Sequence, residues 1–339
     1  MKGDHMRNKR YLVLAAAALA VGALVLAAVL TRQPLEEASN IKFLMDTVVE
    51  IRVTGRNAKA AIDAAFAEME RVEKVFSRHF EDSIVARINQ QAGQWVDVTD
   101  EVIALLQKAL EYSELSDGAF DVTVGRLIDL WGFGSGSNRV PSHTEIVQAL
   151  TTVGYRGVEI DLSKKRVRIP SGTVLDLGGI AKGYAVDQGR KVLEAKGIKS
   201  GMIYAGGDIT TIGAKADGSA WRVGVQHPRQ STELIAIIEM KNKTIVTSGD
   251  YERFFMDNGT RYHHILDPRT GYPASDVISV TIYGGQATDA DALSTTVFVL
   301  GAERGKAFIE SLPGYEALIV DQSGNVWVSS GLEGKVSLL

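Results

Sequence analysis

The segment LDLGGIAKG, residues 175 to 183, combines residue types that could bind a phosphate group. It places a carboxylate, Asp176, before two glycines, and Lys182 stands at the expected start of a helix. Glycines let backbone N–H groups approach an anion, and a helix N-terminus adds the positive end of its dipole. Lys182 would supply a full positive charge. A tight strand-to-helix turn without a ligand explains the glycines equally well, so both interpretations stay open here.

A second segment, TDADALST at residues 288 to 295, could hold the metal ion that accompanies phosphate groups. If the segment is helical, Asp291 and Thr295 are four residues apart and share one face. Carboxylate and hydroxyl oxygens are hard ligands of the kind that Mg²⁺ prefers, and Asp289 offers a further carboxylate. The alternative is helix capping, with Thr288 or Asp289 as the N-cap and the acidic side chains complementing the helix dipole.

Further segments place polar side chains beside glycines. Asp208 follows a Gly-Gly pair where a strand is expected to turn. Asp250 lies in TSGDY, where it or Ser248 could instead cap a helix. RYHHILDP contains His263 and His264 in an expected strand. Successive strand residues point to opposite faces, so at most one of these histidines is expected to be catalytic.

The composition excludes several classes of protein. The chain has 339 residues and a formal net charge of −4, which argues against a nucleic-acid partner because such a partner requires a basic face. It contains no cysteine, which excludes disulfides, thiolate zinc sites, a cysteine nucleophile and a lipid-modified N-terminal cysteine. Any attachment to a membrane must therefore come from a peptide segment.

The N-terminus contains a segment of this kind. Residues 11–30 are apolar and uncharged, and about twenty such residues span a bilayer as a helix. Basic residues precede the run, which predicts a cytoplasmic N-terminus over 1–10, a single-pass anchor in the cytoplasmic membrane and an extracytoplasmic catalytic domain. A cleaved signal peptide is the alternative, but the run is long for one and lacks a small-x-small cleavage site. The opening MKGDH is typical of a cloning remnant, and 31–40 is expected to be a linker.

Residues 41–339 are expected to form one α+β domain with two closely packed lobes. Strand-like alternation covers 43–54, and helical periodicity covers 58–76, with Asn57 as a cap, and about 99–115. After residue 155, β-branched runs mix with expected helices without a regular βαβ repeat, which favours α+β over a doubly wound sheet. Those later helices are expected near 180–196, 287–300 and 302–311.

Taken in order, the motifs resemble those of the ApbE family of FAD:protein FMN transferases. The matching segments are MDT at 45–47, SDGAFD and WGFG between 116 and 134, LDLGGIAKG, GGD, TSGDY, HILDPRTG and DALST. The resemblance covers roughly residues 41–330. It implies that the domain binds FAD with one or two Mg²⁺ ions and cleaves the FAD pyrophosphate. FMN would pass to a threonine or serine hydroxyl of an acceptor protein as a phosphoester, and AMP would leave.

The resemblance also implies roles for individual residues. For the metal, it implies the backbone oxygen of Gly179 with Asp291 and Thr295, and Ser294 as a further candidate. The chain departs from the family at SRHFEDS, where many members have S-x-Y-x-x-x-S, and His79 or Phe80 is expected to take the stacking role there. For FAD, the resemblance implies contacts from Met45, Ala119, Phe120, Asp121, Asp176, Lys182 and Ile265.

His264 matches the histidine of the family and has an ordinary pKa of about 6.5, which suits a general base near neutral pH. Asp250 or Asp208 could be the base instead, or could orient it. The acceptors are expected to be redox membrane proteins. Two other functions stay open: an Mg²⁺-dependent hydrolase that splits FAD into FMN and AMP, and a non-catalytic flavin carrier. The carrier is least favoured because Asp291, Thr295 and His264 are all present.

Overall fold

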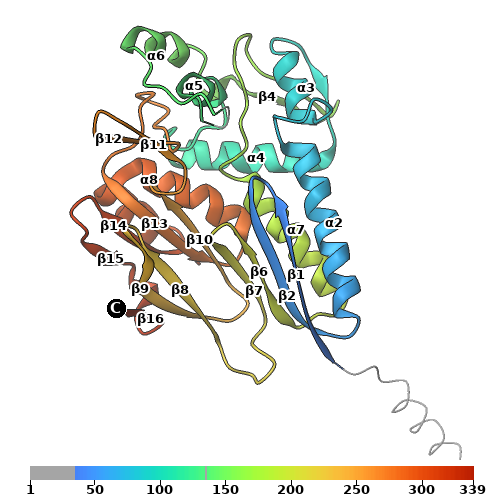
Figure 1. Cartoon of the computed structure of the whole chain (residues 1–339). Coiled ribbons are helices and arrows are strands. Elements are labelled where there is room, and N and C mark those ends of the chain that lie inside the picture. Colours follow the sequence, from blue (N-terminus) through green and yellow to red (C-terminus); the bar gives the residue numbers. More distant parts are fainter. Residues whose placement is uncertain (1–34, 134–135) are drawn as a thin grey trace, which may run out of the picture.

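The computed structural model describes residues 35–133 and 136–339, and its main element is a sheet of eight strands (Figure 1). The strand order is β1-β2-β6-β7-β10-β13-β14-β15, and all neighbours are antiparallel. The strands are β1 (Glu36–Leu44), β2 (Thr47–Gly55), β6 (Ser200–Ala205), β7 (Asp208–Ile212), β10 (Thr244–Gly249), β13 (Val277–Gly284), β14 (Glu316–Asp321) and β15 (Val326–Val328).

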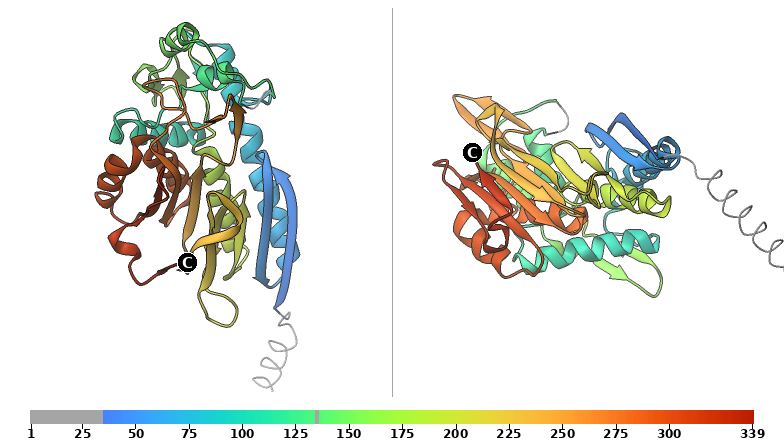
Figure 2. Two further views of the ribbon diagram at one scale, coloured as in Figure 1. Left: turned by 60° about the vertical axis from the view of Figure 1, so that its left-hand side comes forward. Right: turned by 90° about the horizontal axis from the view of Figure 1, so that it is seen from below.

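The main sheet is covered on both faces, because its strands alternate between two hydrophobic cores. In β10, Val246 belongs to the core on the helical face, whereas its neighbour Ile245 belongs to the core beneath a small sheet, β16-β9-β8. The view from below in Figure 2 shows this layering, with β8 and β9 on one side and α4 on the other. These elements are α2 (Ala58–Phe76), α4 (Asp100–Leu115), α7 (Ala181–Ala195), α8 (Ala287–Glu310), β8 (Trp221–His227), β9 (Gln230–Met240) and β16 (Val336–Leu338).

Shorter elements form the upper part of the molecule in Figure 1, above the main sheet. They are α3 (Ile84–Gln90), α5 (Gly125–Trp131), α6 (His143–Leu150), β3 (Val96–Asp97), β4 (Glu159–Asp161), β5 (Arg166–Arg168), β11 (Phe254–Asp257) and β12 (Thr260–His263), with a 3₁₀ turn at Tyr155–Gly157. A second 3₁₀ turn, Ser330–Leu332, lies beside β14 instead. Antiparallel pairing with helices gathered on one face confirms the predicted α+β class.

The long helices confirm the sequence periodicity, with corrections at their ends. α2, α4 and α7 lie where they were predicted, and α8 is interrupted at Gly301 (φ 79°, ψ 179°), between the two predicted helical runs. The predicted cap at Asn57 is wrong: its φ is 51° and its side chain makes no capping hydrogen bond. The predicted cap at TSGDY is also wrong, because β10 ends there in a turn and no helix follows.

The strand predicted over 43–54 is a hairpin. Met45 and Asp46 form its two-residue turn with φ of 53° and 56°, the left-handed conformation that a type I′ turn requires at both positions. The predicted linker is wrong for residues 36–40, which belong to β1. The predicted anchor at 11–30 lies outside the described residues, and within 35–133 and 136–339 no helix has the length and apolar character needed to cross a bilayer.

Candidate active site

The predicted phosphate loop leads directly into α7, and Asp176 shapes it. Asp176 Oδ1 accepts a hydrogen bond from the N–H of Gly178 at 2.8 Å, and Oδ2 pairs with Arg78 Nε at 2.6 Å. α7 begins at Ala181, so Lys182 lies in the first turn of the helix. The loop therefore ends at a helix N-terminus, where N–H groups and the helix dipole favour an anion.

Lys182 lies between two buried aspartates, and we call Lys182, Asp208 and Asp291 the lysine cluster. The Lys182 ammonium forms an ion pair with Asp208, which also accepts the N–H of Thr247 at 3.1 Å. Burial lowers the pKa of Lys182, but attraction to Asp208 and Asp291 outweighs burial and holds this pKa above its ordinary value. Burial raises the pKa of Asp291; Lys182 opposes this rise and Asp208 adds to it. One lysine between two aspartates leaves a surplus of negative charge.

Asp291 and Thr295 lie one helical turn apart on α8 and both reach the start of α7. Asp291 Oδ2 accepts the N–H of Gly183 at 2.9 Å. A Cβ atom added to Gly179 would lie 3.5 Å from Thr295 Oγ1, so the glycine loop and Thr295 are in contact. The structure thus brings Gly179, Asp291 and Thr295 together. A carboxylate, a hydroxyl and a backbone carbonyl are hard oxygen donors, and this set fits Mg²⁺.

Two other metal candidates have partners elsewhere. The buried Ser294 hydroxyl donates to the carbonyl of Asp291 at 2.9 Å and lies 2.8 Å from Ser248 Oγ, so its oxygen is not a free ligand. Asp289 binds Lys108 Nζ at 2.7 Å and a tyrosine hydroxyl, which leaves it no role at the metal. Across the described ranges, no three histidine, aspartate or glutamate side chains are arranged to hold a metal ion. A metal at Asp291 would therefore depend on neutral oxygens and substrate phosphates for its other ligands.

The two histidines lie in different environments, although the predicted strand ends at His263 and does not include His264. His263 is buried, with Nε2 at 2.8 Å from the carbonyl of Ala274 and Nδ1 accepting the N–H of Ile265 at 3.3 Å. Both nitrogens of His263 are therefore occupied by structural hydrogen bonds. Ile265 itself is a buried core residue whose carbonyl accepts the N–H of Ala274.

His264 is partly exposed, and its ring is held by the carbonyl of Arg253. The carbonyl accepts the backbone N–H of His264 at 3.0 Å and lies 3.2 Å from Nδ1, so Nδ1 carries the proton. Nε2 keeps a lone pair and can accept a proton. The expectation of an ordinary pKa near neutrality is wrong, because burial first and Arg253 second lower the pKa of His264 to about 3.

The alternative bases are less suited to accept a proton. Both oxygens of Asp250 are bound by Arg229, at 2.6 and 2.7 Å, and Arg261 Nη1 lies 3.3 Å from Oδ1; we call these three residues the arginine cluster. Asp208 is held by Lys182 and Thr247. The structure does not support Asp250 as the base, because the protonated carboxyl would lose two ion pairs.

The predicted FAD contacts lie in several separate segments of the chain. Met45 lies in the β1–β2 turn, with its N–H donating to Glu73 Oε1 at 2.6 Å. Ala119 and Phe120 are buried, and the Phe120 ring lies against Gly179. Asp121 is a correction: its carboxylate accepts the N–H and hydroxyl of Thr123 at 2.7 and 2.6 Å and the N–H of Tyr155 at 2.9 Å. The Asp121 side chain therefore stabilises its own loop and is not free to bind a ligand.

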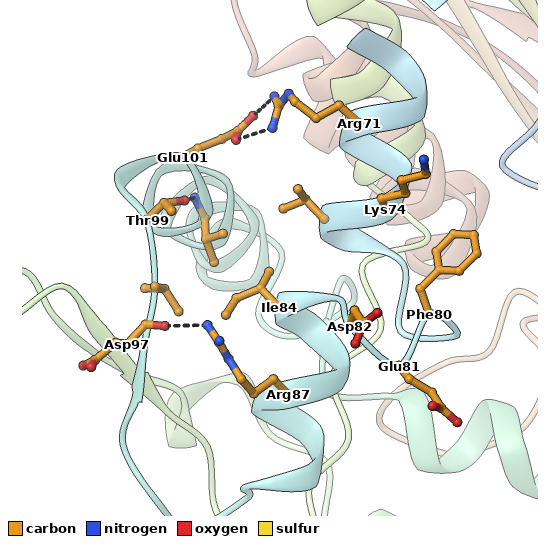
Figure 3. Close-up of a pocket in the computed structure, with 13 residues that line it drawn as sticks. Arg71, Lys74, Phe80, Glu81, Asp82, Ile84, Arg87, Asp97, Thr99 and Glu101 are labelled. Carbon is orange, nitrogen blue, oxygen red and sulfur yellow. Dashed lines mark hydrogen bonds and ion pairs between the residues drawn. The ribbon is translucent and has the colours of Figure 1, made fainter. Parts of the chain in front are cut away.

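His79 and Phe80 are exposed in the loop between α2 and α3, and Phe80 lines a cleft of about 830 Å³. Figure 3 shows this cleft, with Arg71 and Lys74 on α2, Arg87 on α3, and the Arg71–Glu101 ion pair. No member of the lysine cluster lines it, and neither does His264. The cleft lined by Phe80 is thus separate from the lysine cluster.

Sequence reasoning missed three polar residues at this site. Arg78 holds Asp176, and Asp187 binds the first turn of α8. Glu252 interacts electrostatically with Lys182 and Asp208; burial raises its pKa, Lys182 opposes the rise and Asp208 adds to it. Asp187 had a signal in the sequence, because it is a carboxylate on the otherwise apolar face of a predicted helix.

The fold is mixed α/β, and Lys182 with the carboxylate of Asp291 lies at the adjacent N-termini of α7 and α8, an arrangement suited to binding an anionic group. Residues 45–319 match the model of the ApbE family, and the chain belongs to this family. It is 35% identical over 329 residues to the FAD:protein FMN transferase of Treponema pallidum, covering 91% of each chain. It is also 35% identical to the FAD:protein FMN transferase of Vibrio cholerae, with 72% of this chain and 74% of the relative covered.

Solved structures agree with these sequence relatives. The crystal structure of the ApbE protein from Thermotoga maritima superposes with a TM-score of 0.85 at 40% identity, covering 88% of this chain and 99% of that one. The flavinyl transferase ApbE from Pseudomonas stutzeri gives a TM-score of 0.79 at 31% identity, covering 89% of this chain and 97% of that one.

Proposed function

We propose that this chain is an Mg²⁺-dependent FAD:protein FMN transferase that moves FMN from FAD to a threonine or serine hydroxyl and releases AMP. One observation supports this most strongly: the surplus carboxylate of the lysine cluster lies beside Thr295 and the glycine loop at the start of α7. A pyrophosphate and its cation need negative and positive groups of this kind within one site. The close relationship to FAD:protein FMN transferases supports the choice of substrate.

In the proposed site, Asp291, Thr295 and the carbonyl of Gly179 hold Mg²⁺. When bound, Mg²⁺ would neutralise charge on the pyrophosphate. Lys182 would bind a phosphate oxygen, since its ammonium is fixed at the helix N-terminus by Asp208. Ser294 is not proposed as a direct ligand, because its hydroxyl is held by Ser248 and by the backbone carbonyl of Asp291.

His264 would accept the proton of the acceptor hydroxyl at Nε2. The hydroxyl oxygen forms a bond to the phosphorus of FMN, the bond between this phosphorus and the bridging oxygen breaks, and AMP takes the electron pair. Burial and Arg253 lower the pKa of His264 to about 3, so its imidazole is neutral near pH 7 with a free lone pair on Nε2. The same low pKa makes it a weaker base than an ordinary histidine.

Around the flavin nucleotide, we propose that Met45, Phe120 and Ile265 contribute apolar contacts and Ala119 a backbone contact. Asp176 would act through the loop that it shapes. His79 or Phe80 would stack on a ring only if the loop after α2 approaches the phosphate site.

The proposed acceptors are redox membrane proteins, reached by a domain held at the extracytoplasmic face of the membrane by residues 11–30. Deleting residues 1–34 should then release a folded, active domain from the membrane fraction, because no proposed site residue lies in that segment. Loss of transfer to a soluble acceptor by the folded truncated protein would contradict this separation of anchor and catalysis.

The function is tested by incubating the pure protein with FAD and Mg²⁺, with and without an acceptor that has one reactive threonine. A transferase adds one FMN to the acceptor and releases AMP in equal amount, and an acceptor with alanine in place of that threonine stays unmodified. Release of FMN and AMP at the same rate without acceptor would identify a hydrolase. Binding of FAD with no AMP released would identify a carrier.

A further inference from the structure

The first turns of α7 and α8 lie against each other, and neither helix is capped by its own N-cap side chain. The N-cap residues are Ile180 in α7 and Gln286 in α8, and neither makes a side-chain capping hydrogen bond. The approach is close, because a Cβ atom added to Gly183 would lie 2.1 Å from the carbonyl oxygen of Ala287. The N–H groups in these first turns need partners from elsewhere.

Each helix instead caps the other. Asp187 of α7 accepts the N–H of Ala287 at 3.0 Å, the N–H of Thr288 at 2.8 Å and the hydroxyl of Thr288 at 2.6 Å. In return, Asp291 of α8 accepts the N–H of Gly183 in the first turn of α7. This exchange also corrects the capping alternative for Thr288 and Asp289, since the cap of α8 comes from α7.

The two capping aspartates, Asp291 and Asp187, have different roles. Asp291 has one oxygen on Gly183, and its other oxygen has no hydrogen bond among the described residues, so it can bind a cation. Both oxygens of Asp187 are used by α8, and the side chain is buried. Asp187 therefore fixes where α8 begins, and with it the place of Asp291 and Thr295 relative to the glycine loop.

We propose that Asp187 is a positioning residue for the metal site, which it holds together by capping α8 from α7. The proposal rests on the proposed function, because it takes Asp291 and Thr295 as the ligands. A carboxylate suits this position, since a negative charge is stabilising at a helix N-terminus. Asp187→Asn keeps the size of the side chain but removes its negative charge. It also places an amide N–H₂ group, which cannot accept, opposite a backbone N–H of α8 that needs an acceptor.

The experiment measures Mn²⁺ affinity, by electron paramagnetic resonance of the free ion, together with the melting temperature. Loss of a residue that orients metal ligands typically weakens metal binding by about 10- to 100-fold, and this is the loss expected for Asp187→Asn. In transfer assays, the Mg²⁺ concentration for half-maximal rate should rise similarly, while the rate at saturating Mg²⁺ recovers.

Asp276→Asn is the matched control, because Asp276 caps the second part of the same helix. Its Oδ2 accepts the N–H of Ala302 at 2.6 Å, just after the break at Gly301. This variant should lower the melting temperature but leave Mn²⁺ affinity within about threefold, since an altered cap there leaves the first turn of α8 in place. Equal weakening of Mn²⁺ binding in both variants would show a general loss of helix stability and overturn the proposal.

Thr288 provides a second test if Asp187→Asn does not fold. Thr288→Val removes one of the three hydrogen bonds to Asp187 and should weaken Mn²⁺ binding several-fold, whereas Thr288→Ser should restore it. Wild-type Mn²⁺ affinity in Asp187→Asn, or in Thr288→Val, would overturn the positioning role.

Asp291→Asn separates the positioning role of Asp187 from the metal assignment itself. If it abolishes Mn²⁺ binding while Asp187→Asn does not, the metal site stands and only the role of Asp187 fails. If Asp291→Asn binds Mn²⁺ normally, the metal assignment fails and the role of Asp187 fails with it.

Discussion

The lysine cluster and the arginine cluster each combine aspartates with basic side chains, but their charge balance is opposite. In the lysine cluster, one cation lies among two buried aspartates, and the pKa of Asp291 is raised because burial outweighs the stabilisation by Lys182. In the arginine cluster, one buried aspartate is bound by two arginines. A buried carboxylate without a full partner favours a cation, whereas a carboxylate with two partners does not. Charge balance, rather than the presence of an aspartate beside a glycine, separates the proposed metal site from a structural ion pair.

The largest expected effect concerns the proton acceptor. If a carboxylate of either cluster were the base, that cluster would act in proton transfer and not as a cation site or a structural ion pair. His264→Ala should lower transfer by about 10²- to 10⁴-fold, the range for a lost general base, with FAD affinity within a few-fold of wild type. Single-turnover rates at saturating FAD and Mg²⁺, together with FAD titrations, measure both quantities. A variant that mainly loses FAD affinity would show that His264 binds substrate instead. His263→Ala should mainly lower the melting temperature, since its ring makes structural hydrogen bonds.

The next effect tests the surplus charge directly. Asp291→Ala should lower transfer by about 10²- to 10³-fold at limiting Mg²⁺, the cost typical of losing one electrostatic group at a reacting centre. The helix itself tolerates alanine, so circular dichroism should be unchanged. Transfer at the wild-type rate with Mg²⁺ limiting would contradict the metal assignment.

The arginine cluster should respond in stability rather than in Mg²⁺ dependence. Asp250→Asn leaves Arg229 and Arg261 without their carboxylate and should cost about 1–3 kcal/mol of unfolding free energy, as for other buried polar groups that lose a partner. Urea unfolding measures this loss. A shift in the Mg²⁺ requirement comparable to that of Asp291→Ala would mean that the two clusters act as one site. The arginine cluster would then not be a purely structural ion pair.

The smallest effect is the pH dependence that follows from His264. Its folded-state pKa of about 3 lies below the unfolded value, so between these values the unfolded chain binds a proton that the folded chain does not. This contribution to stability is complete above about pH 6.5 and is lost as the pH falls toward 3. His264→Gln should therefore flatten the pH dependence of unfolding between pH 7 and 5. The transfer rate of the wild-type protein should not change its slope near pH 6.5 because of His264, since the pKa of this histidine lies well below that value.

Local patterns predicted the elements of this fold better than the contacts between them. The helical period predicted α2 and α4. The difference between His263 and His264 was predicted from strand alternation, although β12 ends at His263. The hairpin turn at Met45 and Asp46 was missed because neither residue is a glycine, although both adopt positive φ. Asp187 was missed because its partners, Ala287 and Thr288, are 100 and 101 residues away. The ion pair between Asp250 and Arg229 was missed for the same reason, since periodicity cannot reveal that Arg229 will bind this carboxylate. Distant pairings of this kind decide which carboxylates remain free for chemistry.

The central claim is that the lysine cluster is the cation site. The most direct measurement is an anomalous difference map from crystals soaked with Mn²⁺ and AMP. We expect a peak within coordination distance of the free oxygen of Asp291 and of Thr295 Oγ1, with the nucleotide phosphate near Lys182. A peak at another carboxylate, such as Glu81 or Asp82 in the cleft beside α3, with none at Asp291, would contradict it.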